Sequence, residues 1–160
     1  MRETIQKRIG TLLKHSGGTL SAAESCTGGQ ISHLITAVSG ASAYYLGSVT
    51  SYAIPVKEKL LGVPARTIRE NGVVSGEVAA AMAEGVRRLT GSTYSVATTG
   101  LAEGGDERYP EGTVWIGVSG PAGTITRKYC CDLGRAGNIR RFSTLALHTL
   151  ARYIEKDIIK

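Results

Sequence analysis

The chain has 160 residues, of which 42% are hydrophobic, so it is long enough for one domain over residues 1–160 with its own core. Its apolar runs are short and its N-terminus lacks a signal-peptide core, so we expect no membrane span, no secretion and a cytoplasmic location. The net charge of +6 comes from scattered basic residues, and one Trp and one Phe offer little for base stacking, which argues against nucleic-acid binding. A small anionic substrate accounts for the charge equally well.

The first half of the chain alternates helices and strands. Apolar residues recur on one face of residues 1–16 and predict a helix that ends at a Gly-Gly pair. A small-residue strand over 19–23, a helix over 28–38 and a strand over 44–53 follow. Two short helices then begin near Pro55, where Val56, Leu60 and Leu61 are expected to point inward, and near Pro64.

The second half begins with a longer helix, which Ser75 is expected to cap and which ends at Gly91. Its inward face is predicted at four apolar residues, namely Val78, Met82, Val86 and Leu89. A buried strand over 93–99 leads into a polar loop over 100–112, the expected flexible lid, in which Arg108 is available to an anion.

Two strands over 113–119 and 124–131 form a hairpin around a four-residue turn, and a long helix with apolar positions from Ile139 to Ile154 ends the chain. The order is α-β-α-β-α-α-α-β-β-β-α, without a repeat or a linker. It predicts an α/β fold in which helices cover both faces of a mixed sheet.

The stretch from Ser21 to Gly29 (SAAESCTGG) organises this pattern, because a strand there feeds a tight turn that opens a helix. Free N–H groups and the positive end of the helix dipole at such a start attract an oxyanion or a phosphate, with Ser25 at the mouth. The same residues also suit a plain N-cap and glycine turn. The motif is neither G-x-G-x-x-G nor a P-loop, which argues against ordinary dinucleotide or triphosphate binding.

The three cysteines indicate neither a disulfide framework nor a zinc site, because their number is odd and no CxxC spacing occurs. We expect them to be reduced and mostly buried. Cys26 lies beside Ser25 and is either a rival nucleophile or a small buried residue.

Several motifs, in order, together resemble the CinA C-terminal family, in its form without the N-terminal domain found in full-length CinA. They are AESCTGG (23–29), GASAY (40–44), SYA (51–53), KEKLLGV (57–63), GVVS (72–75), TG (99–100) and GTVWI (112–116). The resemblance implies a three-layer α/β/α sandwich. Active members of the family convert nicotinamide mononucleotide to nicotinic acid mononucleotide and ammonia, and the resemblance implies no cofactor and no metal.

Position by position, the resemblance implies Ser25 as nucleophile, Lys57 as catalytic lysine, Tyr52 as assisting tyrosine and Thr99 as a site threonine. A lysine base must be neutral near pH 7, which requires burial or a nearby positive charge. Tyr52 would relay or hold the proton. The substrate-binding set is completed by Cys26, Thr27, Gly28 and Gly29, whose turn would stabilise the oxyanion, and by Gly100.

Two positions depart from the family's usual pattern. Glu103 places a carboxylate where small residues are usual, and Ala136 stands at the usual arginine before the last helix. We expect Arg140, ahead of Arg135, to replace that arginine as phosphate ligand.

These departures favour a second hypothesis, a catalytically silent nucleotide-binding or regulatory module, whereas Ser25, Tyr52 and Lys57 favour an enzyme. A Ser-His-Asp triad is a lower-ranked alternative, and His33, in the helix after the motif, is expected to be a packing or surface residue. The sequence leaves a homo-oligomer open.

Overall fold

The computed structural model describes residues 3–160, so the first two residues of the helix predicted over 1–16 lie outside it. The elements are α1 (Ile5–Ser16), β1 (Leu20–Glu24), α2 (Gln30–Thr36), η1 (Ala41–Ala43), β2 (Tyr45–Thr50), α3 (Ile54–Leu61), α4 (Ala65–Asn71), α5 (Gly76–Thr90), β3 (Tyr94–Gly100), β4 (Thr113–Gly120), β5 (Gly123–Cys130) and α6 (Gly134–Ile158). The predicted order of helices and strands is confirmed, with the short 3-10 helix η1 added.

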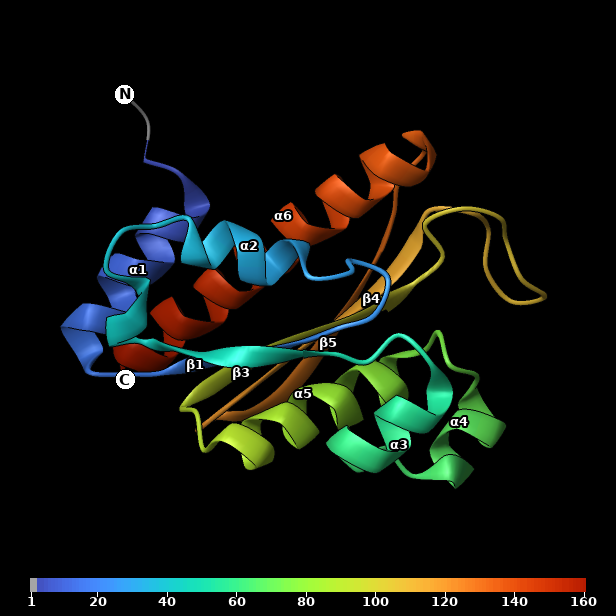
Figure 1. Cartoon of the computed structure of the whole chain (residues 1–160), viewed down its shortest axis with the longest axis horizontal. Helices are drawn as coiled ribbons and strands as arrows, with labels where there is room; N and C mark the ends of the chain where they lie inside the picture. Colours follow the sequence, from blue (N-terminus) through green and yellow to red (C-terminus); the bar gives the residue numbers. More distant parts are fainter. Residues whose placement is uncertain (1–2) are drawn as a thin grey trace.

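The described strands form one mixed sheet in the order β2-β1-β3-β4-β5. β1 pairs in parallel with β2 and β3, while β3 with β4 and β4 with β5 are antiparallel. Helices α1, α2 and α6 cover one face, and α3, α4 and α5 cover the other (Figure 1). This is the predicted three-layer α/β/α sandwich.

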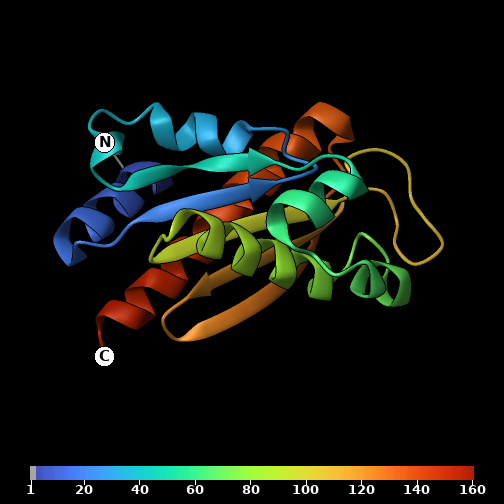
Figure 2. The ribbon, with the colours of Figure 1, turned by 60° about the horizontal axis from the view of Figure 1, so that its bottom comes forward.

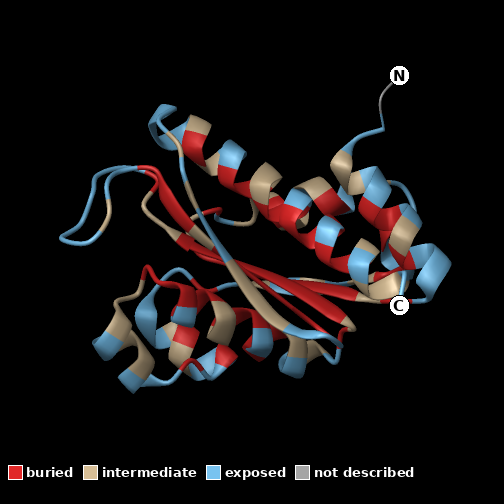
Figure 3. Cartoon of the chain, turned by 180° about the vertical axis from the view of Figure 1, so that it is seen from behind, coloured by how far each residue is buried: buried red, intermediate tan, exposed pale blue. Residues whose placement is uncertain are grey.

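Each side of the sheet has its own apolar layer, and the buried residues follow the inner faces of strands and helices (Figure 3). Phe142 and Leu150 of α6 belong to one layer, and Val78 and Met82 of α5 to the other. The helical spacing of these residues predicted this correctly, and Ser75 caps α5 as expected by accepting the Val78 N–H.

Two apolar predictions are wrong. Leu60 and Leu89 are 47% and 56% exposed. In α3 the buried pair is instead Lys57 and Leu61, four residues apart and therefore on one helical face, which turns Leu60 outward. The predicted hairpin is confirmed, and its four-residue turn begins and ends at Gly120 and Gly123, which pair with each other.

The sheet brings three strand ends together. Glu24, at the end of β1, is in register with Thr50 of β2 and Thr98 of β3. After β1 the chain turns to α2 on one face, and after β2 it turns to α3 on the other (Figure 1). Connections that diverge in this way leave a crevice at the carboxyl edge of a sheet, where ligand sites form in open α/β folds.

The position of α3 depends on one glycine of α5. A Cβ on Gly85 would lie 2.0 Å from the Leu61 carbonyl oxygen, so only glycine lets the two helices approach this closely. Helices α3 and α4 and the loop after β3 gather at the same end of the sheet (Figure 2). Within residues 3–160 no helix combines the length and apolarity that a membrane crossing needs.

Candidate active site

Ser25 and Lys57 meet at the carboxyl edge of the sheet. Ser25 directly follows β1, and Lys57 projects from α3. The Lys57 Nζ lies 2.9 Å from the Ser25 Oγ, 2.6 Å from the Ser51 carbonyl oxygen and 3.0 Å from the Tyr52 carbonyl oxygen. The lysine is only 1% exposed, so these three oxygens form its polar surroundings.

Burial makes this lysine weakly basic. Desolvation lowers the pKa of Lys57 from 10.5 to about 8, and no carboxylate forms an ion pair with it among the described residues. A neutral amine has two N–H donors and one lone pair. The two carbonyl oxygens take the donors, which leaves the lone pair facing the Ser25 hydroxyl. The arrangement therefore suits an amine that removes the hydroxyl proton.

Cys26 is a poor rival nucleophile. Burial raises the pKa of its thiol to about 12, although the Thr98 side chain and the Lys57 charge act in the opposite direction. The thiolate, which is the reactive form, is therefore scarce at neutral pH. Of the two interpretations, the geometry favours a small residue packed against the core.

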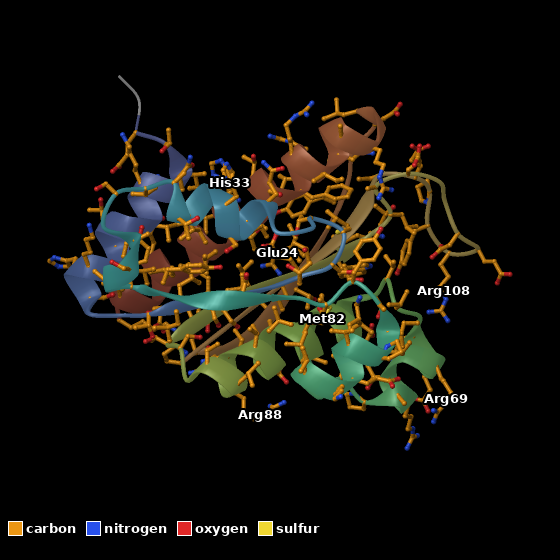
Figure 4. All side chains as sticks on the ribbon, viewed as in Figure 1. Glu24, His33, Arg69, Met82, Arg88 and Arg108 are labelled. Carbon is orange, nitrogen blue, oxygen red and sulfur yellow. The ribbon has the colours of Figure 1, made fainter. Side chains whose placement is uncertain are left out.

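Glu24 is the site residue that the sequence analysis missed. Its fully buried carboxylate accepts the Thr27 hydroxyl at 2.7 Å, the Ile31 N–H at 2.8 Å and the Ser32 N–H at 3.0 Å. Figure 4 shows it between β1 and α2. An acid at the end of a buried small-residue strand, directly before a helix, was the available signal.

This carboxylate corrects the prediction that the α2 N-terminus receives a substrate anion. Glu24 already accepts the N–H groups of Ile31 and Ser32 in the first turn, where the positive end of the helix dipole lies. Its negative charge therefore satisfies the first turn of α2, which leaves the backbone of the preceding turn, at Cys26, as the part of the motif that lines the cavity.

The turn between β1 and α2 is shaped by the remaining motif residues. Gly28 and Gly29 have φ angles of 59° and 100°, which glycine adopts without strain, and the Gly28 N–H donates to the Ser25 carbonyl. The hydroxyls of Thr27 and Thr98 lie 2.9 Å apart. Thr27, Gly28 and Gly29 do not line the cavity at Ser25, so in this structure they shape the turn that carries Ser25 and their contact with a substrate stays a prediction.

A cavity of about 290 Å³ opens above Ser25. Cys26, Thr99 and Gly100 of the predicted binding set line it. The Thr99 hydroxyl donates to the Val73 carbonyl at 2.8 Å, so it ties β3 to the α4–α5 connection. The volume lies at the low end for small-molecule sites, which are about 300–1,000 Å³.

Tyr52 contacts Lys57 through its backbone carbonyl and not, as expected, through its phenol. Its carbonyl oxygen holds the Lys57 amine, but its side chain is 63% exposed and its phenol oxygen accepts a hydrogen bond from Arg135 at 3.3 Å. No hydrogen bond joins the phenol to Ser25 or Lys57, so a proton relay through this group has no path in this geometry.

Arg135, and not Arg140, lies at the cavity. Arg135 lines it and forms an ion pair with Glu103 at 3.6 Å, whereas Arg140 lines a separate hollow beside Leu133 and Gly137. Arg135 and Arg140 are five positions apart in α6, so their side chains leave the helix about 140° apart around its axis. The expectation for Arg140 is therefore corrected in favour of Arg135.

The loop over 101–112 is fastened at several points. Arg108, expected to meet an anion, donates instead to the carbonyls of Asn71 and Glu70 at the end of α4 (Figure 4). Tyr109 packs edge-on against Trp115, and the Leu101 N–H donates to the Thr113 carbonyl. Closure of this loop over a ligand stays a prediction.

Among residues 3–160 no histidine lines the cavity, and His33 lies exposed on α2 (Figure 4). The structure therefore offers no geometry for a Ser-His-Asp triad at Ser25. Over the same residues, no three His, Cys, Asp or Glu side chains are grouped so that they could hold a metal ion. All three cysteines are free, and the prediction that they are mostly buried is wrong, because Cys26 and Cys131 are half-buried and Cys130 is exposed.

The family model of the CinA C-terminal domain matches residues 2–154. A CinA-like protein of Acaryochloris marina is 45% identical over 159 residues, and one of Desulfosudis oleivorans is 44% identical over 151 residues. These alignments cover 97% and 92% of this chain but only 38% and 37% of the two relatives. The chain thus spans well under half of the length of these relatives.

Solved structures of related proteins have the same fold over nearly the whole length of this chain. A competence-damaged protein (CinA) superfamily protein from Klebsiella pneumoniae superposes with a TM-score of 0.91 at 26% identity and covers 95% of this chain and 96% of its own. The competence/damage inducible protein CihA from Agrobacterium tumefaciens gives 0.87 at 30% identity, with 93% and 96% covered.

Proposed function

The chain belongs to the CinA C-terminal domain family, and from that premise we propose that it is an amidohydrolase that deamidates nicotinamide mononucleotide through a seryl intermediate. The products would be nicotinic acid mononucleotide and ammonia. The observation that carries the proposal is the set of contacts at Lys57, a buried amine with a lowered pKa whose three oxygen neighbours include one hydroxyl, that of Ser25.

In the first half-reaction the neutral Lys57 amine takes the Ser25 proton while Oγ attacks the carboxamide carbon. The carbonyl oxygen becomes an oxyanion, for which we assign the Cys26 N–H as a donor because this residue follows the nucleophile and lines the cavity. When the C–N bond breaks, the Lys57 ammonium returns a proton to the leaving nitrogen, and ammonia departs.

In the second half-reaction a water molecule attacks the ester on Ser25, with Lys57 again as base. The C–O bond to Ser25 breaks, the proton returns to Oγ, and the acid leaves. One lysine therefore serves both halves, and its two carbonyl partners hold it in place throughout. Glu24 acts indirectly, because it fastens the turn that presents Ser25.

The cavity supports a small planar amide as substrate. At about 290 Å³ it has room for an aromatic carboxamide, and Ile54, Val73 and Val74 supply apolar walls. A ribose phosphate would extend to the mouth, where Arg135 offers a cation.

The test is ammonia release by the purified protein with nicotinamide mononucleotide, beside nicotinamide, nicotinamide riboside and glutamine. We expect release from the mononucleotide that is abolished in Ser25→Ala. Absence of release from every amide would contradict the proposal.

The second candidate is a nucleotide-binding module without catalysis. It is favoured by Glu103, whose carboxylate faces the arginine at the mouth, and by Ala136. Tight mononucleotide binding without turnover would select it.

A further inference from the structure

Arg135 is held at the cavity mouth by the chain's own groups. Its Nη1 lies 3.6 Å from the Glu103 Oε2, and its Nη2 donates to the Tyr52 phenol at 3.3 Å. Glu103 comes from the loop after β3, Tyr52 from the segment after β2, and Arg135 from the first turn of α6. All three side chains line the same cavity as Ser25.

The surroundings of Arg135 favour an anion. α6 is 25 residues long, its first turn contains no acidic residue, and its N-cap residue Leu133 has no side-chain cap, although the Leu133 N–H donates to the Asn138 Oδ1 at 3.1 Å. The positive end of the helix dipole therefore adds to the guanidinium charge. A guanidinium fork matches carboxylates and phosphates alike. In this structure the anion at that position is the chain's own carboxylate, that of Glu103.

We propose that Glu103 is a specificity-determining residue that competes with a substrate phosphate for Arg135. A phosphomonoester that binds Arg135 must displace the Glu103 carboxylate from Arg135, and its phosphate then stays close to that negative charge. An unphosphorylated amide does not displace Glu103 and is not repelled by it. The site therefore prefers phosphorylated over unphosphorylated amides less strongly than it would with Arg135 unpaired. The identity of these amides rests on the proposed function.

The size of the effect follows from exposure. The side chains of Arg135 and Glu103 are 50% and 66% exposed, so water and salt screen their interaction. Exposed ion pairs of this kind shift an equilibrium by about two- to fivefold. A selectivity change of that size, and not a loss of catalysis, is the expected signature.

The experiment compares kcat/KM for nicotinamide mononucleotide and nicotinamide riboside in a low-salt, phosphate-free buffer. Glu103→Gln should raise the mononucleotide-to-riboside ratio about two- to fivefold, mainly through a lower KM for the mononucleotide. The matched control is Glu107→Gln, which removes one exposed carboxylate from the same loop and should leave the ratio unchanged.

Three results would overturn the proposal. The first is an unchanged ratio in Glu103→Gln, and the second is an equal rise in the control. The third is weaker riboside binding in Glu103→Gln, which would mean that the carboxylate faces the cationic pyridinium ring and not the phosphate.

A double-mutant cycle identifies the group through which Glu103 acts. Arg135→Met should raise the KM for the mononucleotide more than for the riboside, and in that background Glu103→Gln should lose most of its effect. An undiminished effect would mean that Glu103 only repels phosphate and does not hold Arg135, which also overturns the proposal.

Binding measurements separate this inference from the proposed function. Calorimetric titration of Ser25→Ala and of Ser25→Ala/Glu103→Gln with both compounds requires no turnover. Tighter mononucleotide binding in the double variant would support the role of Glu103 even if the wild type released no ammonia. Ammonia release with unchanged binding would leave the function standing and overturn the role of Glu103.

Discussion

The floor and the rim of the cavity are built on opposite principles. The floor consists of Ser25, Lys57 and the two carbonyls that hold the amine, and Lys57 is 1% exposed. The rim consists of the Tyr52 phenol, Glu103 and Arg135, side chains that are half exposed or more. At the floor burial changes the chemistry of a lysine, whereas at the rim water screens the charges.

This difference in exposure indicates which effect a substitution should have at the floor and at the rim. A buried amine without a carboxylate partner loses stability in its charged form, so its environment shifts its pKa by a large amount. An exposed ion pair shifts equilibria by little. Floor substitutions should therefore alter the rate of the chemical step by orders of magnitude, and rim substitutions should alter selectivity by small factors.

The largest effect is expected at Ser25. Ser25→Ala should lower kcat for the mononucleotide by about 10⁴-fold or more, because the proposed nucleophile is lost, while far-UV circular dichroism stays unchanged. Cys26→Ala is the control and should keep most of the activity, since its thiol is protonated. If the cysteine variant were the inactive one, the assignment of the nucleophile would be wrong.

Lys57→Met should lower kcat by about 10³-fold, the usual range of a lost general base. Lys59→Met, which changes an exposed lysine of the same helix, should behave as the wild type. In the wild type kcat/KM should rise with pH through a pKa of about 8, because only the neutral amine accepts the Ser25 proton. A pH-independent kcat/KM across that range would remove Lys57 from the role of base.

The same lysine should change how stability depends on pH. The folded chain loses the Lys57 proton near pH 8 and the unfolded chain near 10.5, so between these values the unfolded state binds more protons and rising pH favours folding. Relative to Lys57→Met, the wild-type free energy of unfolding should increase by about 3 kcal/mol over this window. Urea titrations at pH 7.5 and 10.5 measure it, and parallel behaviour of the two proteins would contradict the buried, weakly basic lysine.

Glu24→Gln tests whether the floor depends on the turn beneath it. Both carboxylate oxygens of Glu24 accept hydrogen bonds, from Thr27, Ile31 and Ser32, whereas the amide of Gln has only one acceptor oxygen. At least one buried donor therefore loses its partner, so the free energy of unfolding should fall by about 1–3 kcal/mol and kcat should fall with it. Glu84→Gln, at an exposed position of α5, is the control for chemical denaturation. Equal stability of the two variants would argue against this role of Glu24.

The smallest effect is expected for Tyr52→Phe, because the carbonyl that holds Lys57 is retained and only the exposed phenol contact with Arg135 is lost. We expect a change in kcat/KM of less than about tenfold in steady-state assays. A loss as large as that of Lys57→Met would show that the phenol turns inward during catalysis, and the distinction between floor and rim would fail.

Much of the architecture was predictable, because helices and strands leave local periodic signals. The spacing of Val78 and Met82 predicted the buried face of α5, and Phe142 and Leu150 did the same for α6. The position of Ser25 at a strand end before a glycine turn was visible in the same way. The error at Leu60 lies in a short helix, where two turns carry too few residues to define a face, and the error at Leu89 lies in the last turn of α5.

The sequence by itself therefore determined the order of the elements, the α/β class and the strand end that carries the candidate nucleophile. Only the tertiary structure decided that Lys57 is buried against Ser25, that Glu24 occupies the start of α2, and that Arg135 rather than Arg140 reaches the cavity. The physical reason is that desolvation and hydrogen bonding depend on neighbours in space. Ser25 and Lys57 are 32 positions apart, and no local pattern records the packing of α3 on α5 that brings them within 2.9 Å.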